Sequence, residues 1–277
     1  MIQRMMDFFT SWFIYPGLSR PSLLVSVGLA VAFGAIWFSA YWTPVLKNPR
    51  AWAVLLGSAI LTVVAISFIQ LPLQFWSGMA LLNFWSNNAL MQWLWLAAIP
   101  QILLTGLVQE ASKLAPVAVY WWCSGRSIDP RMGMALGAVA GAGFGVYEAM
   151  WAHGTVFIAG WSWNLVQAQG LLALAPFWER FFVVGLHISM SALAGYGLAR
   201  GRWWQFYLLA ALIHALVNYS AVLAAAGLWG MVALEVYVAA LSIVITGAVL
   251  WVRWHPAAAR ANRSSAAGPA GHTVGLF

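Results

Sequence analysis

Charged residues are scarce in this chain. Only 7% of its 277 residues are Asp, Glu, Lys or Arg, whereas 63% are hydrophobic, and the mean hydropathy is +0.83. A soluble domain of this size needs far more charge to keep its surface in contact with water. The composition therefore excludes an ordinary soluble protein and predicts one that is embedded in a membrane.

Several familiar functional signatures are also absent. Cys123 is the single cysteine, so no disulfide can form within the chain. No HExxH motif occurs, and a zincin-like metal site therefore has no support. The basic residues give a net charge of +7, but they occur in scattered pairs with no nucleic-acid reading motif between them. We therefore expect the lipid bilayer with its anionic head groups, and no nucleic acid, as their partner.

Apolar runs of about 20 residues, the length that a helix needs to cross the hydrocarbon layer, recur along the chain. We predict an all-α fold, a polytopic transmembrane helix bundle of about seven spans with a polar site inside the bilayer. Pro100 lies in the long third span and predicts a kinked helix or a short re-entrant piece. The predicted spans are 22–46, 52–71, 89–122, 132–152, 179–199, 205–227 and 229–252.

The chain divides into three predicted parts. Residues 1–21 form an N-terminal interfacial segment, residues 22–252 the transmembrane helical domain, and residues 253–277 a basic, disordered cytoplasmic tail. Within the transmembrane domain, two uncharged connections rich in tryptophan, 72–88 and 153–178, are expected to dip into the membrane surface.

Basic residues are distributed unevenly between the predicted connections. The positive-inside rule places the basic loops and the C-terminus in the cytoplasm, and seven spans then put the N-terminus outside. Arg4 and Arg20 disagree with that N-terminal side. We expect an integral protein of a bacterial cytoplasmic membrane with its C-terminus in the cytoplasm. The basic residues concerned are Lys47, Arg50, Arg126, Arg131, Arg200, Arg202, Arg253, Arg260 and Arg263.

Ionisable residues remain inside the predicted spans once the loop charges are set aside. Glu110, Lys113, Glu148, His187 and His214 lie deep in the spans, and Glu179, Arg180 and Glu235 lie nearer the outer boundary. A charge in the middle of a membrane costs at least a few kcal/mol, so each of them needs a partner or a purpose. At about 1.5 Å per residue from the nearest cytoplasmic loop, the glutamates and histidines of the first group lie about 15–25 Å deep. The predicted helices thus deliver proton-active groups to one layer of the bundle.

Four motifs on these helices resemble those of the PrsW/YhfC-type intramembrane proteases, which are related to the CAAX-processing and bacteriocin-processing membrane endopeptidases. The segment QEASK (109–113) resembles the family's EExxK, and GFGVYEA (143–149) resembles its GFxxxE. ERFFVVGLHISMS (179–191) is similar to ERxF…HIxxS, and HALVN (214–218) is similar to HALxN. The motifs follow the family's order, although Gln109 stands where the family has the first glutamate of EExxK.

The resemblance implies cleavage of a peptide bond within or beside the membrane, with a membrane protein or peptide as the substrate. Water would be activated among the glutamates and histidines. The candidate catalytic residues are Glu110, Glu148, His187 and His214. The candidate supporting residues are Lys113, Arg180, Ser191 and Asn218.

Each group has a chemical role that suits its type. Glu110 is the candidate general base, and a nearby lysine or arginine can keep such a carboxylate ionised. His214 and Asn218, one helical turn apart, can donate hydrogen bonds to a developing oxyanion. His187 can share the proton, and Glu148 can orient the water.

The metal content is open at this point. A glutamic-type mechanism requires no cofactor, whereas His187, His214 and a carboxylate can also hold a zinc ion with an open position for water. The spacing of the residues does not separate the two mechanisms.

Other function classes use the same residues. A non-catalytic membrane scaffold or substrate-binding homologue would keep the fold and the site without the chemistry, and Gln109 favours this interpretation. A transporter or proton relay would also use buried carboxylates and histidines, but no internal repeat supports one. Taken singly, the Glu110–Lys113 pair and each histidine have a structural explanation, because polar groups hold membrane helices together.

Overall fold

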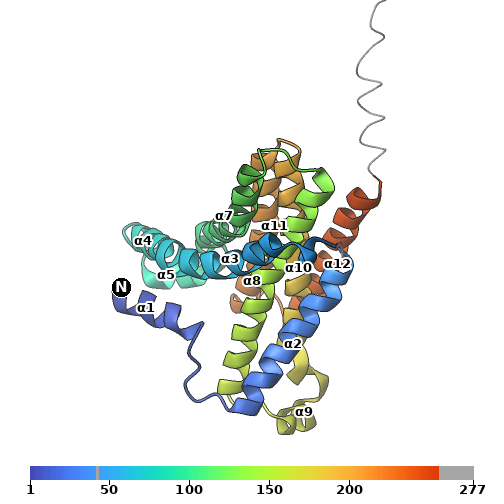
Figure 1. Cartoon of the computed structure of the whole chain (residues 1–277). Helices are drawn as coiled ribbons and strands as arrows, with labels where there is room; N and C mark the ends of the chain where they lie inside the picture. The colour runs from blue at the N-terminus through green and yellow to red at the C-terminus, as the bar shows by residue number, and fades with distance from the viewer. Residues whose placement is uncertain (42–43, 256–277) are drawn as a thin grey trace, which may run out of the picture.

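The computed structural model describes residues 1–41 and 44–255, and within these ranges it contains helices and no strand (Figure 1). The predicted all-α helix bundle is thereby confirmed. The elements are α1 (Ile2–Ser11), α2 (Arg20–Ser39), η1 (Pro44–Lys47), α3 (Pro49–Ala65), η2 (Ile66–Gln70), α4 (Leu71–Leu82), α5 (Asn87–Gln92), α6 (Leu94–Ala97), α7 (Ile99–Cys123), α8 (Pro130–Ile158), α9 (Trp163–Gln169), η3 (Gly170–Leu174), α10 (Ala175–Ala199), α11 (Trp203–Ala225) and α12 (Met231–Trp254).

The starts of the long helices carry clear sequence signals. The Asp129 carboxylate accepts hydrogen bonds from the backbone N–H groups of Arg131 and Met132, and Pro130 fills the first position of α8. An N-cap acceptor followed by proline satisfies the free N–H groups of a first turn and presets its backbone angle. Ser19 and Asn48 cap α2 and α3 in the same way, each followed by a proline in the first turn.

Six segments in the described residues are long and apolar enough to cross a membrane: Arg20–Ser39, Pro49–Leu82, Leu94–Cys123, Trp163–Ala199, Trp203–Ala225 and Met231–Trp254. The predicted span 132–152 falls on α8, which is long enough but is not one of the six. Its many glycines, together with Glu148 and His153, make it less apolar than the other long helices. Every residue of α8 from Gly133 to Gly145 is buried, so neighbouring helices cover this part of it.

Helices α8 and α10 form the centre of the bundle and run antiparallel in close contact. A Cβ atom at Gly137 would lie 2.0 Å from the Ser191 carbonyl oxygen, and one at Gly141 would lie 2.2 Å from that of His187. Only glycine lets the two backbones approach so closely, as in other contacts between small residues of membrane helices. This contact sets the height at which His187 faces α8.

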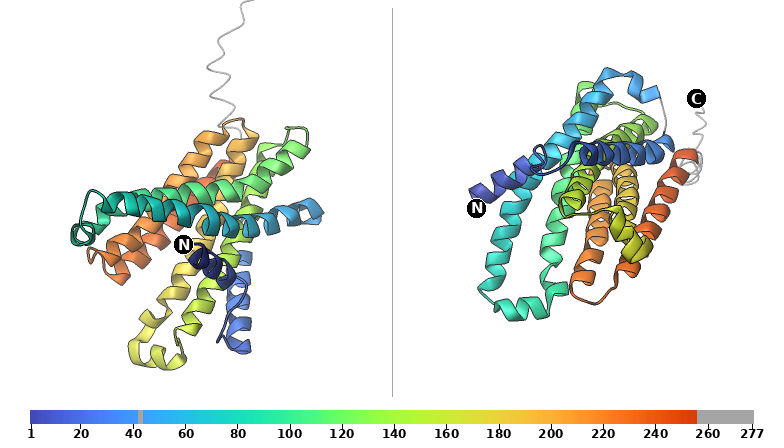
Figure 2. Two further views of the ribbon diagram at one scale, coloured as in Figure 1. Left: turned by 90° about the vertical axis from the view of Figure 1, so that its left-hand side faces the viewer. Right: turned by 90° about the horizontal axis from the view of Figure 1, so that it is seen from below.

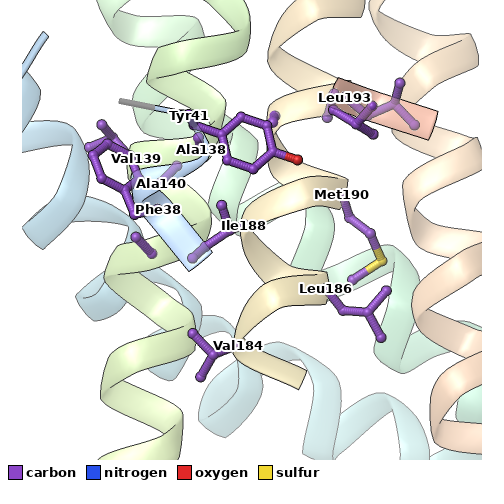
Figure 3. Close-up of a cluster of buried hydrophobic side chains, with 14 of the residues drawn as sticks. Phe38, Tyr41, Ala138, Val139, Ala140, Val184, Leu186, Ile188, Met190 and Leu193 are labelled. Carbon is purple, nitrogen blue, oxygen red and sulfur yellow. The ribbon is translucent and has the colours of Figure 1, made fainter. Parts of the chain in front are cut away.

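Helix α10 contributes core side chains in two directions (Figure 3). Val184 and Ile188 lie on the side of α8, whereas Leu186 and Met190 point away from it. The Tyr41 hydroxyl, also buried, donates a hydrogen bond to Ser189 Oγ at 3.0 Å. Every residue of α10 from Phe182 to Gly195 is buried, so this part of the helix lies in the interior of the bundle.

The predicted connection 72–88 is wrong for most of its length. Helix α3 continues through the π-helical turn η2 into α4, so only residues 83–86 separate this segment from α5. The π turn directly precedes Pro72, and a widened turn accommodates a residue that cannot donate a backbone hydrogen bond. Figure 2 shows α3–α4 and α7 as the two arms of a long hairpin, which α5 and α6 close.

The observed helices differ from the prediction in two further places. The third predicted span, 89–122, is broken at Trp93 and Ala98 into α5, α6 and α7, and Pro100 lies in the first turn of α7. The predicted connection 153–178 is shorter than expected, because α8 extends to Ile158 and α9 and η3 lead into α10. Apolar residues on both sides of each predicted boundary conceal where the helices end.

The structure describes the N-terminal segment, whereas it describes only the first residues of the predicted C-terminal tail. Helix α1 lies in the predicted interfacial segment 1–21, and Trp12 just after it stacks on Trp151 of α8 with ring centroids 4.7 Å apart. The Tyr147 hydroxyl donates to the Trp12 carbonyl at 2.8 Å, so the segment is fastened to the bundle. The predicted tail lies almost wholly outside the described residues, since these end at His255.

Candidate active site

Four helices bring the candidate catalytic side chains together. Glu110 and Lys113 come from α7, Glu148 from α8, His187 from α10 and His214 from α11. Glu110 is 1% exposed and Lys113 is completely buried, which is exceptional for charged residues and requires partners for both. The predicted layer of polar groups therefore exists as one connected cluster.

Lys113 lies at the centre of this cluster. Its Nζ atom is 2.5 Å from Glu110 Oε1 and 2.9 Å from His187 Nδ1. A lysine ammonium carries only donors, so His187 Nδ1 must accept this hydrogen bond. A neutral His187 then holds its proton on Nε2 and donates it to Glu148 Oε2, 2.9 Å away. The Lys113 ammonium thus fixes the tautomer of His187 and keeps the Glu110 carboxylate ionised.

Glu110 is held from a second side by His214. The His214 Nδ1 atom lies 2.7 Å from Glu110 Oε1, and because an ionised carboxylate only accepts, Nδ1 is the donor. The two histidine rings lie 5.3 Å apart between centroids. Glu110 Oε2 is buried and has no hydrogen-bond partner among the described residues. One oxygen of the carboxylate is therefore fully engaged, while the other keeps its lone pairs.

The cluster extends from the buried centre toward an accessible end at Arg180. Its guanidinium contacts Glu148 Oε2 at 3.4 Å and also pairs with Glu179. The side chains of Glu148, Arg180 and Glu179 are 19%, 20% and 32% exposed, in contrast to the enclosed Glu110 and Lys113. The hydrogen-bonded chain therefore links the interior to the rim of the bundle.

The other two predicted supporting residues lie outside this chain of contacts. Ser191, one turn after His187, is buried, and its hydroxyl has no hydrogen-bond partner among the described residues. Asn218, one turn after His214, is half-buried, and its side chain forms no hydrogen bond with any described residue. Both therefore retain donors that another molecule can use.

Phe144 and Gly145 of α8 place the His187 ring. The Phe144 ring meets it edge-on at 5.2 Å and also lies 5.8 Å from Lys113 Nζ. A Cβ at Gly145 would lie 3.1 Å from His187 Cβ, tighter than nearly all such contacts. The GFG segment of the sequence motif thus provides an aromatic wall and the space that the histidine needs.

Gln109 does not face the histidines. Its Nε2 atom donates to Gln70 Oε1 at 3.1 Å, across to the η2 turn, while Glu110 faces α10 and α11. Adjacent helical positions diverge by about 100°, which separates the two side chains. The residue that departs from the family motif thus lies beside the charged cluster and takes no part in its hydrogen bonds.

The partners of Gln109 were missed at the sequence level. Gln70, Gln74 and Ser77 face Gln101 and Thr105 across the α4–α7 hairpin. A signal was present, because polar residues recur every three or four positions in both segments. It was lost because residues 72–88 were predicted to be a connection, which removed the helix that carries half of the contacts.

Glu110, His187 and His214 offer a donor set for a metal ion. One ligand atom from each lies within 4.8 Å of the other two, and all three residues are buried. Two imidazoles and a carboxylate are a recurrent zinc donor set, and the unpartnered Glu110 Oε2 adds a free lone-pair donor. The residues therefore fit a divalent ion in type and position, provided that Lys113 Nζ withdraws from its contacts with two of them.

The comparison with known families agrees with this geometry. The profile of the PrsW family of intramembrane metalloproteases matches residues 49–248, which include all four helices of the cluster. The chain belongs to the PrsW family. The resemblance seen in the four motifs is thus confirmed, and the chain is an integral membrane protein of a family of intramembrane proteases, with a peptide or protein as substrate. No curated protein and no solved structure gives a significant match.

Proposed function

We propose that this PrsW-family protein is an endopeptidase that hydrolyses a peptide bond in or near the membrane with a water molecule activated by Glu110. The observation that supports this most is the asymmetry of the Glu110 carboxylate. Oε1 is bound by Lys113 and His214, whereas Oε2 has no partner among the described residues. A carboxylate fixed through one oxygen is oriented to accept a proton at the other.

One base is sufficient for both proton transfers of the hydrolysis. Glu110 Oε2 accepts a proton from water while the water oxygen bonds to the carbonyl carbon of the scissile peptide. The tetrahedral intermediate then expels the amine, to which Glu110 returns the proton. Donors are needed for the negative oxygen of the intermediate, and the unpaired hydroxyl of Ser191 and amide of Asn218 are the available groups.

The remaining charged residues hold the base in place. Lys113 keeps Glu110 ionised in a low-dielectric interior, where an unpaired carboxylate would take up a proton. His187 accepts from Lys113 and donates to Glu148, which Arg180 in turn binds. These contacts make Lys113, His187 and Glu148 positioning residues of a network that is worth more when complete.

A metal-dependent form of the same activity uses the same three ligands. Glu110, His187 and His214 would hold the ion, which when bound supplies a Lewis acid and a more acidic water. Lys113 decides between the two forms, because an ammonium between two ligands repels a divalent cation. Metal analysis of the purified protein and cleavage with and without a chelator separate them, since a glutamic mechanism predicts no bound metal and no effect of the chelator.

Cleavage of labelled membrane-spanning peptides by the purified protein in lipid bilayers tests the proposal. The wild type should cleave within the peptide, and Glu110→Gln, which preserves size but cannot accept the proton, should not. If the wild type is inactive and Gln109→Glu creates cleavage, the chain is a non-catalytic homologue, and the proposed function is wrong. The position of Gln109 toward Gln70 argues against that outcome.

The orientation of the chain in the membrane is a second part of the proposal. We infer that the basic connections and the C-terminus lie in the cytoplasm. Figure 1 shows the α7–α8 connection and the end of α12 on the same side of the bundle, away from α9. Cys123, the last residue of α7, is exposed next to the connection that carries Arg126, and it reports on this side. An impermeant maleimide should label it in permeabilised cells only, and equal labelling of intact cells would reverse the orientation.

A further inference from the structure

A ladder of neutral polar side chains runs between the arms of the α4–α7 hairpin. We call it the amide ladder; its members are Gln70, Gln74 and Ser77 on one arm and Gln101, Thr105 and Gln109 on the other. Gln109 donates to Gln70 at 3.1 Å, and Gln74 donates to Thr105 and to the Gln101 carbonyl, each at 2.9 Å. Between Gln101 and Gln109 the ladder is about 12 Å long, which matches three to four residues of an extended chain.

The two ends of the ladder lie at functionally different places. One end is Gln109, adjacent in sequence to Glu110 of the candidate active site. The other end reaches a cavity of about 390 Å³ between α4 and α5–α7, whose lining includes Gln74, Gln101 and Gly78. The ladder therefore leads from a cavity in the hairpin to the residue next to the enclosed base, on the neighbouring face of α7.

The ladder is not saturated with hydrogen bonds. Gln109 Oε1 and the hydroxyl of Ser67, one turn before Gln70, are buried without a partner among the described residues. The contact between Gln70 and Gln74 is long, at 3.5 Å. These two atoms can therefore form hydrogen bonds with another molecule without breaking a contact between the two arms.

The substrate of an intramembrane protease has a complementary need. A peptide bond can be attacked only after its helix unwinds locally, which leaves backbone N–H and C=O groups without partners in hydrocarbon. Side-chain amides offer the same donor and acceptor as a peptide group and can replace the lost bonds. The π turn η2, at the base of α4, is of the kind that often marks a functional position in a helix.

Resting on the proposed function, we propose that the amide ladder binds the unwound backbone of the substrate and leads its scissile bond to Glu110, after α4 and α7 have separated. Glu110 is 1% exposed, so the helices around it must also move apart before water or a peptide reaches it.

A second groove is a less suitable place for an unwound peptide. It has a volume of about 490 Å³ between α2, α3 and α8, and almost all of its lining is apolar, including Val31, Leu55 and Val146. Apolar side chains cannot satisfy free backbone groups, whereas they suit an intact helix or a lipid chain. We therefore assign the unwound segment to the ladder.

Photocrosslinking locates the bound peptide directly. A membrane-spanning peptide carrying a photoreactive residue next to the scissile bond is bound to the full-length Glu110→Gln protein in bilayers, where it stays intact. The proposal predicts crosslinks to the facing residues of α4 and α7. Crosslinks confined to the α2–α3–α8 groove would overturn it. Because this measurement needs no cleavage, it remains decisive if the proposed function fails.

The kinetics of Gln74→Met combined with Gln101→Met provide the second test. Methionine keeps the length of glutamine and removes the amide, so two lost backbone hydrogen bonds should raise KM about tenfold with little change in kcat. Gln205→Met, on an exposed position of α11, is the matched control and should match the wild type. Unchanged KM with a lower unfolding temperature would show that the ladder only fastens the hairpin. If the double variant does not fold, the crosslinks decide.

Discussion

On one face of α7, Glu110 and Lys113 form charged hydrogen bonds to α10 and α11; on the neighbouring face, Gln101, Thr105 and Gln109 form neutral ones to η2 and α4. The charged face is closed, with Lys113 in contact with both Glu110 and His187. Each face leaves one buried side-chain oxygen of α7 without a partner among the described residues, Glu110 Oε2 on the charged face and Gln109 Oε1 on the neutral one. A buried charge that loses its partner is far more costly than a buried amide. The difference suggests that α7 is fixed on its charged side and can separate on its neutral side.

The largest effect on kcat should come from removing the carboxylate at position 110, and adding one at the adjacent position 109 should have little effect. Glu110→Gln removes the proposed base and should lower kcat by about 10²–10⁴-fold, the usual contribution of general acid–base catalysis. Gln109→Glu should change kcat little, since its side chain points to Gln70 and a carboxylate is already present at the site. Peptide cleavage in bilayers measures both. Equal losses in the two variants would mean that the faces are not functionally distinct.

Removing the central cation should cost most in stability. Lys113→Met leaves Glu110 Oε1 with His214 alone and His187 Nδ1 without a donor, so we expect the free energy of unfolding to fall by about 3–5 kcal/mol. Equilibrium unfolding in mixed micelles measures this. The variant should also bind a divalent ion more readily, because the ammonium no longer occupies the space between the ligands. Wild-type stability would show that the charged face is not the rigid one.

An intermediate effect is expected from the helix contact that supports the charged face. Gly141→Ala places a Cβ atom 2.2 Å from the His187 carbonyl oxygen, so α10 must shift. We expect a loss of about 1–3 kcal/mol in stability together with reduced cleavage, because His187 moves away from Lys113. Gly28→Ala in α2 is the matched control, because no atom of the described residues lies within 4 Å of its new Cβ. Unfolding and cleavage should both remain near wild type there.

The smallest effect should come from the neutral face. Gln70→Met removes the hydrogen bonds to Gln109 and Thr105 but leaves no charge behind, so the loss of stability should be about 1 kcal/mol. The same unfolding measurement, with exposed Gln205→Met as control, tests this value. A loss as large as that of Lys113→Met would remove the proposed contrast between the two faces and would argue against a hairpin that separates.

The sequence located the cluster of ionisable side chains better than it located the boundaries of the helices. Glu110, Glu148, His187 and His214 could be found because ionisable groups are rare and expensive in hydrocarbon, so each one carries information. The end of α4 at Leu82 could not be found, because tryptophans and apolar residues are equally at home in a membrane helix and at its surface. The amide ladder was missed with it.

The spacing of residues along single helices was determined by the sequence alone. Hydropathy alone established that the chain is a helical membrane bundle. The repeat of 3.6 residues per turn placed Glu110 and Lys113 on one helix face, and His214 and Asn218 on another.

Contacts between helices were decided only by the tertiary structure. That Glu110 and not Gln109 faces the histidines, and that Lys113 lies between Glu110 and His187, depends on how α7 is rotated against α10 and α11. Rotation and distance follow from packing across interfaces, such as that of Gly141 against the His187 backbone. Neighbouring positions differ by about 100° in direction, so a local pattern cannot choose between them without the neighbouring helix in place.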